Sequence, residues 1–239
     1  MVWVFMLFTM KHVILFAMVA SLYVPVAVAE KPEAEEKPNA KKKRTGIFEL
    51  IDNRRKRAFL TQAINNAKQI FCLMVEFDGD FGEFPSDETA SGIDGGKEYK
   101  GAHSNDYLGQ LIVAGYTKAE GIFYVEKGAK KQPDNIIDSK ARTLAAGECG
   151  FTYVLGQSLN SHSSHPLLCA PMTGDGTKFD PEVFGGKALV LRIDGSVKTY
   201  EIDENGEVVL ENGKKLFETG IGTVWGVNGF KREMLLFPK

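Results

Sequence analysis

Two histidines and two cysteines in the second half of the chain have side chains that could bind a metal. His162 and His165 precede Cys169, and Cys149 lies upstream of all three. Imidazole nitrogen and thiolate sulfur are common protein ligands of zinc. The spacing is not that of a known zinc finger, and the serine-rich sequence around the histidines is equally typical of a surface loop. The four residues therefore indicate either a zinc site or a loop beside a cysteine pair.

The cysteine count bears on the same choice. The chain has three cysteines, and in an oxidising compartment an odd number suggests one disulfide and one remaining thiol. We expect Cys149 and Cys169 to pair, because Cys72 falls on the apolar stripe of a predicted helix and would pack there as a small hydrophobic side chain. Closing a loop of about 20 residues would stabilise the fold by about 3 kcal/mol. In a reducing compartment all three would be core residues.

The sequence contains no motif for nucleophilic or phosphoryl-transfer chemistry. It has no G-x-S-x-G element, which presents a serine nucleophile, and no G-x-x-x-x-G-K-[ST] loop. No pair of carboxylates is singled out for work on a sugar. We therefore predict a non-enzymatic protein with a structural or protein-binding role. An exported hydrolase of unrecognised type and a metal- or ligand-binding module are the alternatives.

A basic segment precedes an acidic body. Residues 30–57 hold ten Lys/Arg against six Asp/Glu, whereas residues 58–239 hold eighteen against twenty-five. An acidic body argues against nucleic-acid binding, which requires a basic face. The segment could contact an anionic surface, or it could be a solvated linker and helix start. Its cations form two groups: Lys41, Lys42, Lys43 and Arg44, then Arg54, Arg55, Lys56 and Arg57.

The first 29 residues have the three parts of a secretory signal peptide. Lys11 stands before an uncharged apolar run over residues 13–24, and Ala27-Val28-Ala29 follows. We predict cleavage after Ala29 and export to the periplasm or the extracellular space. Met1 or Met10 could be the true start, and a membrane anchor is the alternative to cleavage, because about 20 apolar residues can span a bilayer.

Beyond the signal, residues 30–51 are predicted to form a disordered charged linker, and residues 52–239 a single domain. The linker is rich in Glu, Lys and Pro and has nothing to bury against its ordering entropy. From about residue 52, apolar side chains recur at spacings of three and four, which predicts a long helix. We expect this helix to begin near Gly46 or Asp52 and to end at Gly79 or Gly82, ahead of Pro85. Its stripe comprises Leu60, Ala63, Ile64, Ala67, Ile70, Phe71, Met74 and Phe77.

The remaining elements are shorter. Residues 104–114 predict a second helix with a polar cap at its start and Gly115 as its stop. Residues 121–125 and 151–155 read as strands. Asp194-Gly195 between two apolar runs predicts a hairpin of residues 188–193 and 197–202, and residues 208–210 would complete a meander. The result is an α+β fold, with one long N-terminal helix packed on a small antiparallel sheet.

The end of the long helix resembles the globular part of type II secretion pseudopilins. Residues 76–85 read E-F-D-G-D-F-G-E-F-P, and in that family the helix likewise ends in an aromatic residue followed by Asp-x-Gly-x-aromatic-Pro. The second helix, with Leu108, Leu111 and Gly115, and the hairpin with Asp194-Gly195 are similar to pilin-like proteins. The resemblance covers about residues 55–125 and 185–210. It implies a pilin-like α+β domain and an envelope protein or assembly component as partner.

The resemblance also implies a calcium site and marks a departure from the family. Some pseudopilins bind calcium in a late loop, and Asp203, Asn205 and Glu207 offer alternating oxygens here. Calcium takes six or more oxygens, and a plain hairpin turn explains the same residues. Family members keep an apolar half-helix that packs in the filament, whereas this chain has two groups of cations in that place. We therefore expect a pilin-type domain released as a soluble protein.

Overall fold

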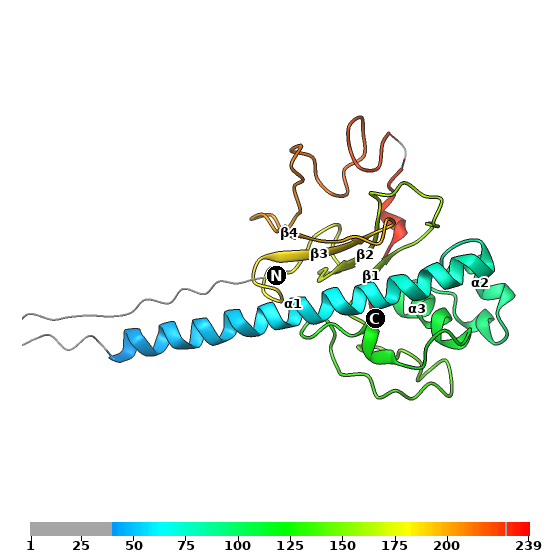
Figure 1. Cartoon of the computed structure of the whole chain (residues 1–239), viewed down its shortest axis with the longest axis horizontal. Coiled ribbons are helices and arrows are strands. Elements are labelled where there is room, and N and C mark those ends of the chain that lie inside the picture. The colour runs from blue at the N-terminus through cyan, green and yellow to red at the C-terminus, as the bar shows by residue number, and fades with distance from the viewer. Residues whose placement is uncertain (1–39, 228) are drawn as a thin grey trace, which may run out of the picture. The chain divides into compact units, whose positions relative to one another are not determined.

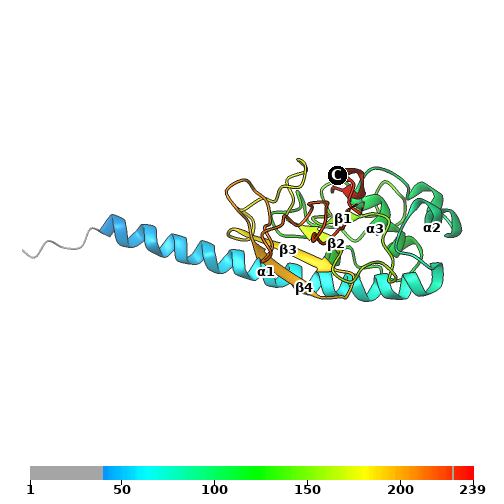
Figure 2. The same ribbon diagram turned by 90° about the horizontal axis from the view of Figure 1, so that it is seen from above.

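The computed structural model describes residues 40–227 and 229–239. The predicted signal peptide, its cleavage site after Ala29 and the predicted linker as far as residue 39 lie outside the described residues. The first element, α1, is a helix of 42 residues, Ala40–Phe81, which confirms the predicted long helix. Figures 1 and 2 show α1 running along one face of the sheet, with its first turns extending beyond the other elements.

The N-terminal boundary of α1 corrects the sequence prediction. Residues 40–51, assigned to the linker, are helical, because this part of the chain lacks proline and is rich in helix-forming Lys, Arg, Leu and Glu. The other boundary lies where predicted. Gly82 adopts a left-handed φ of 82°, and its N–H donates to the Asp78 carbonyl at 2.7 Å, which closes the last turn. Gly79 remains inside the helix.

Short helices follow α1. Asp87–Gly92 (α2) begins at a capping box, in which the Ser86 hydroxyl accepts from the Thr89 N–H at 3.1 Å and the Ser86 N–H donates to the Thr89 hydroxyl. A 3₁₀ turn, η1, spans Gly96–Glu98. Ser104–Val113 (α3) confirms the second predicted helix, and Gly115 has a φ of 90° just beyond its end.

The strand predicted at residues 121–125 is wrong. The chain forms a 3₁₀ turn there, η2, over Glu120–Phe123. The reason is tertiary: the side-chain amide of Asn66 on α1 donates to the carbonyls of Gly121 at 3.2 Å and of Tyr124 at 3.0 Å. These carbonyls are therefore bound by the helix rather than by a neighbouring strand.

In the described part of the chain, five antiparallel strands form one sheet in the order β4-β3-β2-β1-β5. The predicted hairpin is confirmed as β3 (Lys187–Arg192) and β4 (Val197–Glu201). The predicted strand at residues 151–155 is confirmed as β1 (Thr152–Val154). Two strands, β2 (Pro166–Ala170) and β5 (Leu235–Leu236), were not predicted. Residues 208–210 make only isolated bridges to Ile202 and Lys215 rather than a third meander strand. One 3₁₀ turn, η3 (Arg232–Met234), precedes β5.

Alternation along the strands divides the core into two layers. On one face of the sheet, Leu189 and Leu191 pack with the apolar seam of α1 and with α3. On the other face, Ala188 and Val190 pack beneath the C-terminal segment, which contributes Phe217 and Trp225. Complete burial of a large apolar side chain is worth about 1.5–3 kcal/mol. The seam on α1 is fully buried and comprises Ala63, Ala67, Ile70, Met74 and Phe77.

No helix among the residues described is both long and apolar enough to cross a membrane.

Candidate binding groove

The predicted disulfide between Cys149 and Cys169 is not formed. Both residues are buried free thiols, and the sheet separates them, because Cys149 belongs to the α1 side of the core and Cys169 to the C-terminal side. Burial raises the pKa of Cys149 to about 11 and also raises the pKa of Cys169. Both thiols are therefore protonated core groups at neutral pH. Cys72, predicted to be buried, is exposed, since it lies off the seam of α1.

His162 and His165 lie together but apart from the cysteines. Their ring centroids are 5.4 Å apart, and the ring of His165 stacks on Trp225 at 4.4 Å. The Nδ1 atom of His165 lies 3.1 Å from the side-chain oxygen of Gln157. Burial lowers the pKa of His165, and the neighbouring His162 lowers it further. In residues 40–227 and 229–239, no three or more His, Cys, Asp or Glu side chains are grouped to hold a metal.

The residues predicted for calcium are engaged in a turn. The Asp203 carboxylate accepts hydrogen bonds from the N–H groups of Asn205 at 2.9 Å and Glu207 at 2.8 Å. These bonds lower the pKa of Asp203, and the bond from Glu207 has the larger effect. The Glu207 carboxylate forms an ion pair with Lys215. The carboxylates of Asp203 and Glu207 are thus engaged within the turn, and calcium binding there stays a prediction.

The second group of predicted cations is divided by the fold. Lys56 turns toward the body and pairs with Asp52 at 3.1 Å and with Glu182 at 3.3 Å, and the hydrogen bond that its ammonium donates to Asp52 is the main cause of its raised pKa. Arg54, Arg55 and Arg57 are exposed. The first group, Lys41, Lys42, Lys43 and Arg44, lies in the opening turns of α1.

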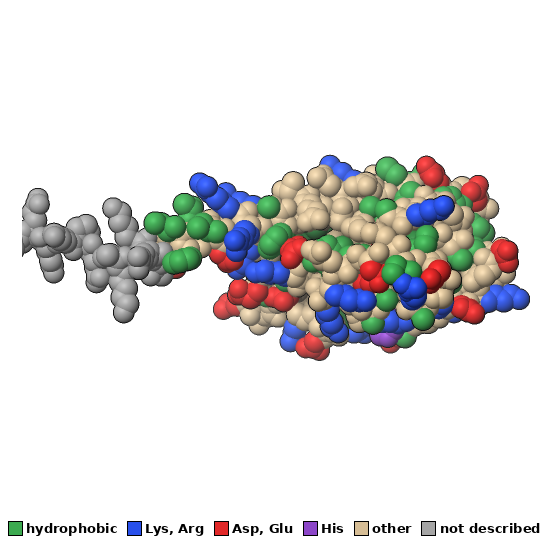
Figure 3. Space-filling model, turned by 90° about the horizontal axis from the view of Figure 1, so that it is seen from below, with side chains coloured by type: hydrophobic (Ala, Val, Ile, Leu, Met, Phe, Trp, Pro, Cys, Tyr) green, Lys and Arg blue, Asp and Glu red, His purple; other side chains and the backbone are tan. Residues whose placement is uncertain are grey.

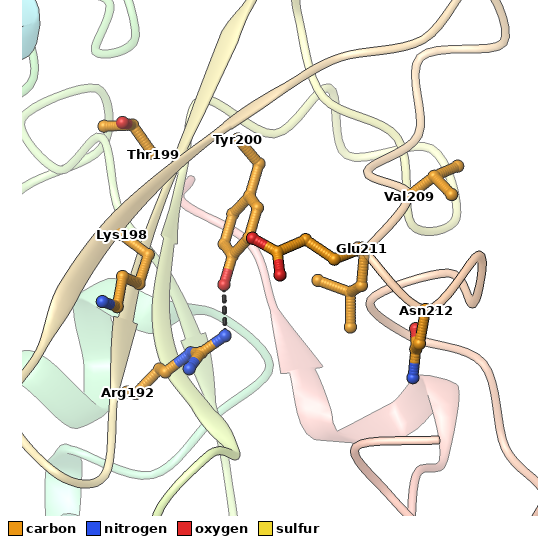
Figure 4. Close-up of a pocket in the computed structure, with 8 residues that line it drawn as sticks. Arg192, Lys198, Thr199, Tyr200, Val209, Glu211 and Asn212 are labelled. Carbon is orange, nitrogen blue, oxygen red and sulfur yellow. Dashed lines mark hydrogen bonds between the residues drawn. The ribbon is translucent and has the colours of Figure 1, made fainter. Parts of the chain in front are cut away.

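An open groove runs beside β4, the strand at one edge of the sheet, and has a volume of about 510 Å³. One wall is formed by Lys198, Thr199 and Tyr200 of β4 with Arg192 of β3, and the other by residues 209–212. Figure 4 shows the side chain of Thr199 pointing away from Tyr200, so that Thr199 lines the groove with its backbone. We call this feature the β4 groove.

The hydrogen-bond register shows which backbone groups of β4 are available. The N–H of Arg192 donates to the Ser196 carbonyl, and the N–H of Ile202 donates to the Gly186 carbonyl. Because bonded and non-bonded pairs alternate in antiparallel strands, Lys198 and Tyr200 exchange bonds with β3. The N–H and C=O groups of Val197, Thr199 and Glu201 therefore point to the free edge. Nothing in the described part of the chain pairs with them.

A guanidinium group dominates the chemistry of the β4 groove. An Nη atom of Arg192 donates to the Tyr200 hydroxyl, which Figure 4 shows as the dashed line, and the guanidinium lies 5.8 Å from the centroid of that ring. Its Nε is buried and has no partner among the described residues. Burial raises the pKa of Tyr200, Arg192 opposes that rise, and Glu211 adds to it. The groove thus carries two cations, Arg192 and Lys198, and one anion, Glu211.

Sequence reasoning missed the β4 groove. Alternation within the predicted hairpin already placed Lys198 and Tyr200 on one face of the sheet. The opposite wall, which includes Glu211, follows the turn at residues 203–207. The predicted meander places residues 208–210 beside the hairpin as a paired strand, whereas these residues make only isolated bridges and leave a groove.

Two buried carboxylates form a second polar cluster that the sequence did not reveal. Glu120 accepts from the N–H of Leu144, and Glu148 accepts from the N–H of Ala145 at 2.7 Å. Glu148 also lies 3.0 Å from the Lys131 ammonium, whereas the second oxygen of Glu120 has no partner within the described residues. Burial is the main cause of the raised pKa of Glu120. The cluster fixes the long connection between η2 and β1.

Comparisons with known protein families, with characterised proteins and with solved structures find no match to this chain.

Proposed function

We propose that this protein is an exported, non-enzymatic envelope protein with a pilin-like α+β domain, and that its role is to bind another protein in a secretion or surface assembly. The free edge of β4 beside the β4 groove supports this proposal most directly. An extended segment of a partner protein can add to such an edge as a further strand, with main-chain hydrogen bonds providing affinity. Val197, Thr199 and Glu201 supply the donors and acceptors.

The charges of the β4 groove define the partner segment. Arg192 and Lys198 favour an acidic side chain, because both are cations whose N–H groups can donate charge-assisted hydrogen bonds to a carboxylate. Glu211 on the opposite wall disfavours a run of acids. The expected ligand is therefore an extended segment with one Asp or Glu flanked by uncharged residues.

The lining of the β4 groove bears on the alternative of an exported hydrolase. The eight residues that line it include no Ser, Cys or His. A nucleophile with an adjacent base is the usual arrangement in covalent hydrolases, and this groove does not supply it. The geometry therefore supports binding better than covalent hydrolysis.

Site-specific photo-crosslinking in the exporting cell tests the proposal. A photoreactive residue replaces Val209, which is exposed on the wall opposite β4. We expect crosslinks to one extended, acid-containing segment of an envelope protein, identified by mass spectrometry, and amide-exchange protection of residues 197–201 in that complex. Thr199→Pro removes an N–H from the free edge and should abolish both signals. Thr199→Val, the matched control, keeps the N–H and should keep them.

Two outcomes would reject the proposal. One is a crosslinking pattern that is identical in the Thr199→Pro variant, since strand addition requires that N–H. The other is recovery of the folded protein from the cytoplasm with residues 1–29 intact, which would remove the envelope assignment.

A further inference from the structure

The first turns of α1 expose a cluster of large apolar side chains. Ile47, Phe48, Leu50 and Ile51 are 55%, 70%, 53% and 42% exposed, respectively. We call these four residues the α1 patch. Figures 1 and 2 show that α1 extends beyond the other described elements in this region. Figure 3 shows hydrophobic side chains gathered on these turns, with Lys and Arg side chains close by.

The α1 patch is not a continuation of the buried seam. Seven residues make almost two helical turns, so positions seven apart share a face. Counting back from Ala63 and Ile70 leads to Lys56, which pairs with Glu182 on the body, and then to Glu49. The face that covers the sheet is therefore polar at this end of the helix. A longer core would place its apolar residues on that face, and the chain does not.

The residues that align with the α1 patch are exposed and basic. Arg54 follows Leu50 by four residues and Ile47 by seven, and Arg55 follows Ile51 by four, so both arginines lie on the same side of the helix as the patch. One acid, Asp52, follows Phe48 by four residues and lies beside the patch, and its carboxylate is paired with Lys56 at 3.1 Å. The sequence places four further cations, residues 41–44, in the turn before the patch. An apolar patch with two exposed arginines beside it therefore occupies a solvent-exposed part of α1.

The charges beside the α1 patch indicate what kind of surface the patch binds. A helix that binds in the interface of an anionic membrane has Phe or Leu on one side and Lys or Arg around it. The cations contact lipid headgroups while the apolar side chains enter the acyl boundary. Two copies docked patch to patch with parallel helices would bring Arg54 and Arg55 of each copy together, and like charges disfavour that pairing.

We propose that the α1 patch, together with Arg54 and Arg55, is a peripheral docking site for an anionic lipid surface. The first turns of α1 lie in the interface, with the patch inserted and the arginines at headgroup level. The site is separate from the β4 groove, so the protein can hold its partner segment while it rests on the membrane. If the α1 patch did not bind lipid, the proposed strand addition at β4 would be unaffected, and the reverse also holds.

Vesicle binding tests the proposal with the protein purified from the exporting host, its N-terminus read by mass spectrometry. We compare vesicles of phosphatidylcholine alone with vesicles containing phosphatidylglycerol. Binding should be at least about tenfold stronger to the anionic vesicles at low salt and should weaken as salt is added. Phe48→Asp combined with Ile51→Asp should lower that binding about tenfold or more. These side chains are exposed, so the thermal unfolding midpoint should not change.

Three further variants separate the roles of the arginines and of the apolar side chains in vesicle binding. Arg54→Gln with Arg55→Gln should reduce binding to anionic vesicles and leave binding to neutral vesicles unchanged. Ile221→Asp is the matched control, because Ile221 is 89% exposed on a C-terminal loop, and this variant should bind like the wild type. Phe48→Trp should show a blue shift of its fluorescence on anionic vesicles.

Equal binding to both kinds of vesicle would overturn the proposal, as would wild-type binding by the Phe48→Asp and Ile51→Asp double variant. A concentration-dependent dimer that this double variant abolishes would replace it with self-association through the α1 patch.

Discussion

Proline substitutions at two adjacent residues of β4 should differ sharply in their effect on stability. The N–H of Lys198 faces β3 and is bonded within the pair with Val190, whereas the N–H of Thr199 faces the free edge. Proline lacks an N–H and is tolerated in sheets mainly at edges. Lys198→Pro therefore breaks the ladder, and Thr199→Pro leaves every ladder bond in place.

The expected loss in the free energy of unfolding follows from the hydrogen-bonding groups that each substitution leaves without a partner. Lys198→Pro removes one backbone hydrogen bond, worth about 1 kcal/mol, and leaves a buried acceptor of Val190 without its donor at a further cost of about 1–3 kcal/mol. We expect a loss of about 3 kcal/mol in the free energy of unfolding. Thr199→Pro should cost less than about 1 kcal/mol, because neither loss applies.

Urea unfolding followed by circular dichroism measures both variants. With a denaturant slope of about 2 kcal/mol per M, the midpoint should fall by about 1.5 M for Lys198→Pro and by less than about 0.5 M for Thr199→Pro. Lys198→Val and Thr199→Val control for the loss of the side chains. Equal shifts for the two prolines would refute the register of β3 and β4, and with it the free edge on which the proposed function depends.

Three further outcomes are expected from the core. Phe77→Ala should lower the free energy of unfolding by about 3–5 kcal/mol, measured by urea titration, because the ring is fully buried; a loss below about 1 kcal/mol would contradict the packing of α1 on the sheet. The folded protein should react with a maleimide at Cys72 at once and at Cys149 and Cys169 only after unfolding, and mass spectrometry of the labelled peptides reads this directly. Glu120 has a raised pKa in the folded protein, so its contribution to stability is complete at low pH and is lost as the pH rises above the ordinary carboxyl value of 4.5. Glu120→Gln should abolish that part of the pH dependence when the free energy of unfolding is measured against pH. An unchanged dependence would contradict the burial of an ionisable group there.

Local signals accounted for much of the backbone. The apolar stripe predicted α1, Asp194-Gly195 predicted the turn between β3 and β4, and Gly82 and Gly115 ended their helices where expected. Each of these features depends on bonds between residues close in sequence. The segment at residues 121–125 failed because Asn66, far away in the chain, binds its carbonyls.

The candidate sites depended on contacts that sequence spacing cannot supply. Cys149 and Cys169 are about 20 residues apart, which loop-closure arguments treat as a good pair, yet they belong to the two core layers on opposite sides of the sheet. The sequence groups the four cations of residues 54–57 together, but helical geometry directs Lys56 toward the body while Arg54 and Arg55 stay in solvent.

The sequence alone determined where α1 ends and how β3 and β4 turn into one another, because hydrogen bonds between near neighbours fix those features at little entropic cost. Only the tertiary structure decided that no other described segment pairs with the edge of β4 beside Arg192, and that the apolar residues at the start of α1 point away from the core. Both outcomes depend on which distant segments cover which surfaces, and a residue's own neighbours in the chain carry no information about that.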